Sequence, residues 1–203
     1  MYRKALLLII ILLSSTYTYA KDNVLRPVYG LEWGVSCSFY NRDYILYTTE
    51  DKFLVELEDI ASNNHVNGSL TAYGGFRYKQ IETSVKIGYE GVSKNFRVIP
   101  IGLRLSYFFG KSADNGLFAN LESSLGIPME KKYRESINTN LGLGYRFHIS
   151  KKFSIDYKLS FGYLAAQPLT FYNYHELNQI KPGNIKVSEL DVLSVKLSTA
   201  LNF

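Results

Sequence analysis

The sequence is short of cysteine and of long apolar runs, and each shortage removes a class of protein. The single cysteine, Cys37, cannot form an internal disulfide, and we interpret it as a small apolar wall residue. After residue 20, no apolar run approaches the 18 residues that suggest a transmembrane helix. The 23 Lys and Arg residues are scattered, and no nucleic-acid-binding motif is present. Disulfide-rich, helical-membrane and nucleic-acid-binding proteins are therefore excluded.

The first 20 residues have the features of a secretory signal peptide. Two basic residues precede Ala5–Leu13, an apolar core that is too short to span a bilayer as a helix. A polar stretch follows and ends in Thr18-Tyr19-Ala20, which suits cleavage. We therefore expect residues 1–20 to be a signal peptide and residues 21–203 to form one exported domain.

From residue 27 onward, apolar and polar residues alternate with the period of two that is typical of a β-strand. Within Ile81–Glu90, for example, all three charged residues share one parity, and the opposite parity is apolar apart from one threonine. Each alternating segment is long enough for a tilted strand across a bilayer, which takes about 9–11 residues. The eight segments are residues 28–39, 70–78, 81–90, 99–109, 117–125, 137–149, 153–163 and 193–203.

An exported chain with this pattern is either a soluble secreted domain or a barrel in the outer membrane. The volume of the side chains distinguishes the two. The interior of an eight-stranded barrel is just wide enough to be filled by side chains, and the apolar stripes are too bulky for it. The opposite stripes, rich in Gly, Ser and Asn, fit. We therefore predict an all-β fold: an eight-stranded, antiparallel, up-and-down transmembrane β-barrel whose apolar face contacts lipid.

The connections between the segments alternate between short turns and longer loops. Lys79-Gln80, residues 110–116 and residues 150–152 are short, whereas residues 41–67 and 164–188 are long. Outer-membrane barrels have short periplasmic turns and longer external loops. Both termini are therefore expected on the periplasmic side. Aromatic residues gather near both ends of the apolar face, as in the aromatic girdles of membrane barrels.

Two features of the long loops predict local structure. Thr48 as an N-cap, Asp51 three residues later, and apolar residues at helical spacing within Phe53–Ala61 predict a short helix in the first external loop. Such a helix is either a lid on the barrel mouth or a partner site. The last long loop contains the aromatic cluster Phe171–His175, which either packs on itself or contacts sugars.

The inward stripe carries a nearly balanced set of charges. In the simplest register, each of the three short hairpins places an arginine opposite an acid inside the barrel, an arrangement that favours pairing. The three pairs are Arg77 with Glu82, Arg104 with Glu122, and Arg146 with Asp156. The other charges on this stripe are Glu32, Lys86, Glu90, Lys158 and Lys196. With Tyr73, Phe108 and Phe118 among them, these charges predict a plugged lumen, and the alternative is a narrow passive channel.

On these residues, the chain resembles the small outer-membrane barrels of the OmpA/OmpX type, in the broad porin-like family of Gram-negative bacteria. The resemblance covers roughly residues 27–203, and its most specific residue is the terminal Phe203, which closes an alternating strand. It implies that Phe203 is read by the barrel-assembly machinery. It also implies outer-membrane lipid as a partner, together with an external ligand or partner that the sequence does not identify.

Two classes of function follow. The first is a non-enzymatic surface barrel that acts in envelope integrity, adhesion or binding through its external loops. The second is a lipid A-modifying enzyme, because His148-Ile149-Ser150 matches the His-x-Ser motif of a lipid A deacylase. The topology places Ser150 in a periplasmic turn, and no carboxylate is placed to orient His148. His65 and His175 lie in different loops, so we expect no metal site and no cofactor.

Overall fold

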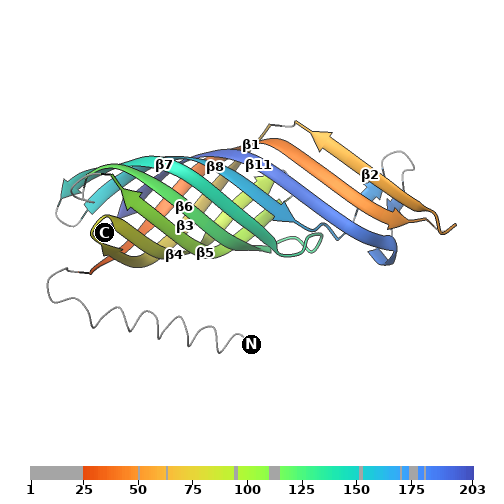
Figure 1. Ribbon diagram of the computed structural model, residues 1–203, viewed down its shortest axis with the longest axis horizontal. Helices are drawn as coiled ribbons and strands as arrows, with labels where there is room; N and C mark the ends of the chain where they lie inside the picture. The colour runs from red at the N-terminus through yellow and green to blue at the C-terminus, as the bar shows by residue number, and fades with distance from the viewer. Residues whose placement is uncertain are drawn as a thin grey trace, which may run out of the picture.

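Eight antiparallel strands close into a barrel in the computed structural model, which confirms the predicted fold (Figure 1). The structure describes residues 25–49, 51–62, 64–93, 96–109, 115–150, 153–169, 171–173, 178–180 and 182–203. The predicted signal peptide, residues 1–20, lies outside the described residues, as do Tyr174 and His175 of the aromatic cluster. None of the helices in the described part of the chain is long and apolar enough to cross a membrane.

The barrel strands follow one another around the cylinder in chain order. They are β1 (Arg26–Thr48), β3 (His65–Tyr78), β4 (Ile81–Ser93), β5 (Phe96–Phe108), β6 (Gly116–Pro128), β7 (Ser136–Ser150), β8 (Phe153–Ala166) and β11 (Ile185–Asn202). β11 pairs with β1, so the last strand closes on the first, and both ends of the described chain lie at the short-turn end. The remaining elements are β2 (Leu54–Ala61), β9 (Phe171–Asn173), β10 (Asn178–Ile180) and a 3₁₀ turn, η2 (Pro182–Asn184).

The apolar stripe faces outward along every barrel strand, as predicted. Leu103 is 61% exposed and Leu141 is 62% exposed, whereas the neighbouring inward-facing Glu122 is only 2% exposed. This division follows from strand geometry, because successive side chains point to opposite faces. The outer surface is thus aliphatic around the middle of the barrel, and the polar stripe fills the interior.

Aromatic side chains on the outer face gather near the two ends of the barrel. At the short-turn end, the ring of Phe203 lies 6.2 Å from that of Tyr29 and 5.7 Å from that of Phe153, measured between centroids. At the other end, the exposed aromatic side chains are Phe39, Tyr89, Phe161 and Tyr163. Two girdles of aromatic side chains therefore border the aliphatic band, which is the arrangement of a membrane barrel.

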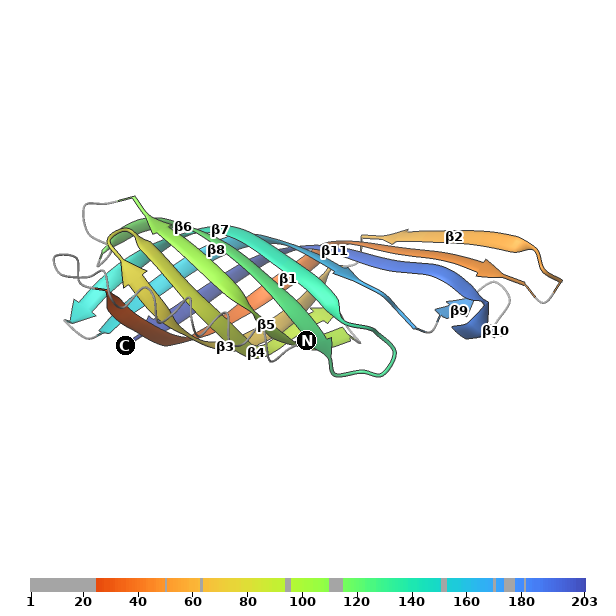
Figure 2. The same ribbon diagram turned by 60° about the horizontal axis from the view of Figure 1, so that its bottom comes forward.

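Three strands continue past the far end of the barrel as a twisted blade (Figures 1 and 2). β1 leaves β3 after the Ser38↔His65 pair and then pairs with β2 along residues 41–48. β11 remains on the other edge of β1 as far as Ile185. We call residues 41–48, 54–61 and 185–192 the blade. β2 is its outermost strand, and the small β9–β10 hairpin lies beside the tip of β11 in Figure 2.

The helix predicted in the first long loop is wrong, because Leu54–Ala61 form the strand β2. The extended part of β1 offers a backbone edge to which β2 pairs, and a helix would leave that edge open. Val55 and Leu57 pack against the buried Ile45 and Tyr47 on one face of the blade. Much of the two segments predicted as loops, residues 41–67 and 164–188, is likewise strand.

A bulge at Phe39 reverses which residues of β1 face inward. The register between β1 and β11 shifts between Ser38 and Tyr40. Before the bulge, even-numbered residues such as Ser38 are buried, whereas beyond it the buried residues are the odd-numbered Ile45 and Tyr47. One extra residue changes the parity of every residue that follows. The inner face of the blade is therefore continuous with the wall of the lumen.

Candidate functional site

A cluster of buried charges fills the middle of the lumen. The Glu122 carboxylate of β6 accepts a hydrogen bond from Lys86 Nζ at 2.5 Å and from Arg104 Nε at 3.0 Å, and it also pairs with Lys158 Nζ. Lys86 lies on β4 and Lys158 on β8, neither of which neighbours β6. Each of these four side chains is at most 6% exposed. Glu122 thus ties β4, β5 and β8 to β6 through the lumen.

A second carboxylate, Glu32 of β1, connects the same cations to the opposite wall. Its Oε2 pairs with Arg104 Nη2 and lies 3.1 Å from Lys158 Nζ. Its Oε1 lies 3.9 Å from Lys196 Nζ, and Lys196 in turn donates to Glu90 Oε1 at 3.3 Å. Arg104 and Lys158 therefore each bridge two carboxylates, which compensates the cost of burying them.

A smaller network lies nearer the short-turn end and is centred on Arg146. Its guanidinium donates to both Asp156 oxygens at 2.7 Å and to Glu82 Oε2 at 2.9 Å. A fork of this kind is the strongest arrangement of an arginine and a carboxylate. The guanidinium carbon also lies 4.5 Å from the centroid of the Phe108 ring. Arg146 is 3% exposed, so the network belongs to the interior.

The three short hairpins have the register that the sequence predicts. The opposed pairs are Arg77↔Glu82, Arg104↔Glu122 and Arg146↔Asp156. Arg104 and Arg146 form ion pairs with their opposite acids. Glu82 differs, because the arginine that it binds at 2.9 Å is Arg146 of β7 rather than its register partner Arg77. Arg77 lies instead at the mouth of the barrel, where it lines a cavity.

Cations and carboxylates are matched in the buried networks. The cations are Lys86, Arg104, Arg146, Lys158 and Lys196, and the carboxylates are Glu32, Glu82, Glu90, Glu122 and Asp156. A buried ion without a partner costs several kcal/mol, whereas a matched set is tolerated. The sequence placed eleven charges on the inward stripe; the structure buries these ten, whereas the eleventh, Arg77, is only partly buried.

An aromatic layer separates the charged cluster from the short-turn end. Phe108 and Phe118 are almost fully buried, and their ring centroids are 5.1 Å apart. Gly144 makes room for this layer, because a Cβ at that position would lie 2.4 Å from Phe118 Cζ. Beside them, the Tyr73 hydroxyl donates to Asn202 Oδ1 at 2.5 Å, and Arg104 lies over the Tyr73 ring.

An apolar lid closes the opposite end of the lumen. Its buried members are Val92, Phe96, Val98, Leu164, Ala166, Leu190 and Val192. Phe96 is fully buried, and its ring stacks on Tyr133 with the centroids 4.1 Å apart. The loop that carries Tyr133 is held down by backbone hydrogen bonds from Arg134 to Gln167 at 2.8 Å and from Leu169 to Lys132 at 2.7 Å. Two connections at this end of the barrel therefore cover the mouth together.

Sequence reasoning missed this lid, although the sequence contains a signal for it. On β4, β5, β8 and β11 the inward parity is polar near the short-turn end and becomes apolar near the far end. Val98 and Val192, for example, share the parity of the lumen residues Arg104 and Lys196. A change from polar to apolar along the inward stripe marks the point where the lumen is closed.

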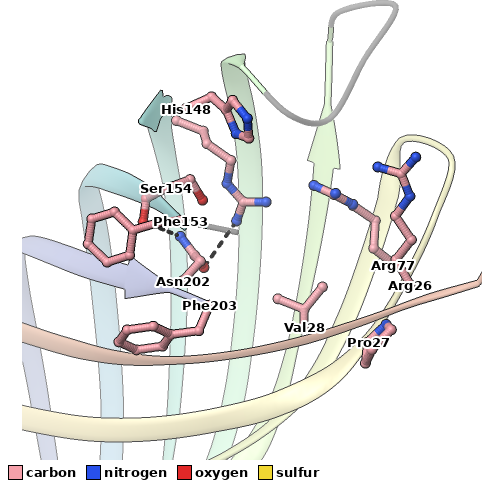
Figure 3. Close-up of a pocket in the computed structure, with 10 residues that line it drawn as sticks. Arg26, Pro27, Val28, Arg77, His148, Phe153, Ser154, Asn202 and Phe203 are labelled. Carbon is pink, nitrogen blue, oxygen red and sulfur yellow. Dashed lines mark hydrogen bonds between the residues drawn. The ribbon is translucent and has the colours of Figure 1, made fainter. Parts of the chain in front are cut away.

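The cavities of the barrel differ greatly in size. The void beside Glu32, Arg104 and Lys158 has a volume of about 10 Å³, which is at most one water molecule. At the short-turn end, a vestibule of about 390 Å³ opens at the end of the barrel (Figure 3). Its lining residues are Arg26, Pro27, Val28, Arg77, Arg146, His148, Phe153, Ser154, Asn202 and Phe203.

The His148-Ile149-Ser150 motif lies at this end of the barrel without the geometry of a catalytic triad. His148 is an exposed vestibule residue whose register partner is Ser154, and an irregularity in β7 separates it from Ser150. The carboxylate of Asp156 forms an ion pair with Arg146 instead of orienting the His148 ring. Among the described residues, no group of three or more His, Cys, Asp or Glu side chains is placed to hold a metal ion.

The blade carries its own polar contacts outside the barrel. On the outer face, Arg42 Nε lies 2.6 Å from Glu58 Oε1, and Arg42 Nη1 lies 3.6 Å from Asp191 Oδ2. On the inner face, Asp43 stands directly opposite Asp59 across the β1–β2 pairing. Burial, together with the charge of Asp59, raises the pKa of Asp43 to about 6.

No protein-family model and no curated protein matches the sequence. Among solved structures, the chain is similar to Neisserial surface protein A with a TM-score of 0.42 and 11% identity, over 84% of this chain and 95% of that one. It is also similar to the outer-membrane protease OmpT from Escherichia coli, with a TM-score of 0.40 and 9% identity, over 91% of this chain and 97% of that one. Identities this low concern the fold alone.

Proposed function

We propose that this protein is an outer-membrane barrel of a Gram-negative bacterium, without enzymatic activity, that presents the blade and the lid at the cell surface. The observation that carries the proposal is the outward aliphatic band, which lies between two girdles of aromatic side chains and surrounds a lumen filled with paired charges. In water, such a band would be an apolar patch far larger than soluble proteins expose. In a bilayer, the same band is buried in hydrocarbon.

The lumen supports a plugged barrel rather than a channel. Glu122, Lys86 and Lys158 meet within the lumen, Lys158 also pairs with Glu32 of β1, and the lid covers one mouth. An ion moving along the axis would have to displace these buried pairs, at a cost of several kcal/mol each. The role of the barrel is therefore to hold its external surface in place.

The blade is the part of the molecule best suited to binding. Its three paired strands hold side chains in fixed positions, whereas an open loop would have to be ordered by its partner at an entropic cost. Beyond the aromatic girdle at the far end of the barrel, the outer face of the blade presents Arg42, Tyr44, Glu58, Glu189 and Asp191. Adhesion, or binding of an external partner, is the activity that this surface supports.

Phe203 supports a role in assembly, as the resemblance implies. It is exposed on the outer face at the short-turn end, and its backbone N–H donates to Tyr29 O at 3.0 Å. The barrel-assembly machinery is therefore the partner that we propose for the last strand, with Phe203 as its signal.

Membrane fractionation and gel mobility test the location and the fold together. We expect the protein to sediment with outer membranes, to resist extraction without detergent, and to migrate faster in SDS gels before boiling than after. Recovery of the folded protein from the soluble fraction would contradict the proposal.

Proteolysis of intact cells tests the orientation. We expect cleavage only within the blade and the adjacent external connections, at residues 50–64 and 167–184. Lys79 and Gln80, in the short turn at the opposite end, serve as the internal control and should be cut only after the cells are opened. The reverse pattern would invert the proposed topology.

Planar-bilayer recordings test the plug. We expect no steady conductance from the native protein. Stable single-channel currents at low voltage would favour the passive channel instead.

A further inference from the structure

The blade ends in an open strand edge. β2 pairs with β1, and none of the other described strands pairs with its outer side. Figure 2 shows β2 as the outermost strand of the blade, with the β9–β10 hairpin on the side of β11. The pairing runs from Asn41↔Ala61 to Thr48↔Leu54 without a bulge, so the edge is regular along its whole length. A regular open edge offers its N–H and C=O groups to a further strand.

The sequence of β2 lacks most of the features that prevent an edge from pairing. Proteins protect such edges with lysine, proline, bulges or very short strands. Leu54–Ala61 contains neither lysine nor proline, and its 8 residues are not a short strand. It carries three acids instead, Glu56, Glu58 and Asp59. The backbone of the edge is therefore available, and its side chains select the partner by charge.

The three acids disfavour pairing between two copies of the chain. In a symmetric antiparallel pair of β2 strands, residues that oppose each other lie on the same face of the sheet, so even-numbered residues oppose even-numbered ones. Every such register that pairs most of the strand sets Glu56 opposite Glu56 or Glu58, Glu58 opposite Glu58, or Asp59 opposite Asp59. Like charges in direct opposition destabilise a ladder. We therefore expect the occupant of this edge to be another protein.

The charge of the edge is only partly compensated within the blade. Arg42 pairs with Glu58 at 2.6 Å, but no cation among the described residues forms an ion pair with Glu56 or Asp59. Asp59 instead stands opposite a second acid, Asp43. Basic side chains on an added strand would lie directly across from these carboxylates, which favours pairing. The edge is thus complementary to a basic segment.

Apolar residues on both faces of β2 define the rest of the contact. Val55 and Leu57 belong to the apolar layer on the inner face of the blade, where they pack against the buried Ile45. On the outer face, Leu54 and Ile60 are exposed and stand on either side of the acids. A strand added beside β2 would extend both rows with apolar side chains of its own.

We propose that the edge of β2 binds an extended basic and apolar segment of another protein by strand addition. This inference rests on the proposed display of the blade at the cell surface and names the class of its partner. In antiparallel pairing, basic residues of the segment oppose Glu56, Glu58 and Asp59, and apolar residues oppose the others. From its own N-terminus, the segment reads apolar, basic, basic, apolar, basic, apolar, apolar.

A synthetic peptide with this pattern, acetyl-Thr-Val-Lys-Arg-Val-Lys-Ile-Val-amide, is the probe. Isothermal titration measures its binding to the folded full-length protein in a zwitterionic detergent, and a matched peptide carries glutamate at every basic position. The test variant is Glu56→Lys combined with Asp59→Lys. The control variant, Asp51→Lys combined with Glu189→Lys, makes the same change of charge beside β2 but not on it. Gel mobility before boiling verifies that each variant is folded.

We expect the native protein and the control variant to bind the basic peptide about tenfold more tightly than the acidic one. The test variant should reverse this preference, because its lysines oppose the glutamates of the acidic peptide. The inference is overturned if the native protein binds neither peptide. It is also overturned if the two variants lose affinity for the basic peptide equally, because the attraction would then be a general effect of charge.

Alternate N-methylation of the basic peptide distinguishes strand addition from attraction between side chains alone. In an antiparallel pair, every second N–H of a strand points to its partner and the others point away. Of two peptides methylated at odd or at even positions, we expect one to lose about tenfold in affinity and the other to keep it. Equal affinity of the two would contradict strand addition.

Sedimentation of the native protein in detergent tests for a second copy on the edge. We expect a monomer, and a dimer that is lost in the test variant would overturn the choice of partner. A protein that fractionates with outer membranes but binds neither peptide would reject the inferred partner and leave the proposed location standing.

Discussion

Lys86 and Glu122 meet inside the lumen, with Nζ and Oε2 2.5 Å apart, although they lie on strands that do not pair with each other. The strand between them, β5, contributes Arg104 to the same carboxylate. The contact therefore ties three consecutive strands together through the lumen as well as through the backbone ladder. Its strength depends on the exclusion of water, because both side chains are at most 2% exposed.

Replacing Glu122 by glutamine removes the charge that Lys86, Arg104 and Lys158 share. We expect the free energy of unfolding to fall by about 3–5 kcal/mol, because buried cations are left without compensation. Denaturant titration of the refolded protein in detergent or lipid measures it. Glu189→Gln on the exposed face of the blade is the control and should change stability by less than about 0.5 kcal/mol. Equal losses in both variants would show that the lumen pairs are not desolvated.

Replacing Leu141 by arginine tests whether the outward face is in hydrocarbon. A charge at the level of the bilayer midplane costs about 2–4 kcal/mol in a membrane barrel. Leu54→Arg is the matched control, because Leu54 is equally exposed, at 64% against 62%, but lies on the blade. We expect only the Leu141 variant to fold less stably in lipid vesicles. Comparable stability of the two variants would place Leu141 in water.

We expect protonation of Asp43 to stabilise the blade. Its pKa is about 6 in the folded protein, against an ordinary value of 3.8 for an aspartate carboxyl in the unfolded chain. As the pH rises, the unfolded chain therefore loses this proton at a lower pH than the folded protein does. The contribution of Asp43 is therefore neutral below about pH 4, becomes destabilising as the pH rises from about 4 to 6, and reaches its full penalty above about pH 6. Asp43→Asn should remove that penalty.

Hydrogen exchange in the blade amides of residues 41–48 and 54–61 measures the effect. Native protein and variant are compared at the same pH, so that intrinsic exchange rates cancel. We expect slower exchange in Asp43→Asn at pH 8 and no difference at pH 4. A difference that is the same at both values would mean that the substitution acts through packing rather than through the charge.

Removing the Phe96 ring should open the lid. Phe96 is fully buried against Tyr133, and a Phe→Ala change at such a site costs about 3–5 kcal/mol. We also expect residues 129–135, which are protected in the native protein, to become susceptible to protease, because this loop rests on the ring. Phe53→Ala at the exposed tip of the blade is the control and should alter neither property. An unchanged cleavage rate in Phe96→Ala would mean that the loop is held by its backbone hydrogen bonds alone.

The strand count, the direction of the apolar face and the hairpin registers were all predictable, because each depends on local information. The parity of Leu141 and Glu122 follows from the period of a strand, and the length of the Lys79-Gln80 turn fixes the pairing of Arg77 with Glu82. The helix prediction at residues 54–61 failed for a different reason. Its apolar spacing fits both a helix and a two-faced strand, and the edge offered by β1 decided between them.

The sequence by itself determined that polar and apolar residues alternate along each strand, where the chain turns, and which residues share a face. Those properties are set by neighbouring residues along the backbone. Only the tertiary structure decided that Arg146 binds Glu82, that the bulge at Phe39 turns β1 into the core of a blade, and that Phe96 and Tyr133 close the lumen. These contacts join residues far apart in sequence, and closure of the barrel brings them together.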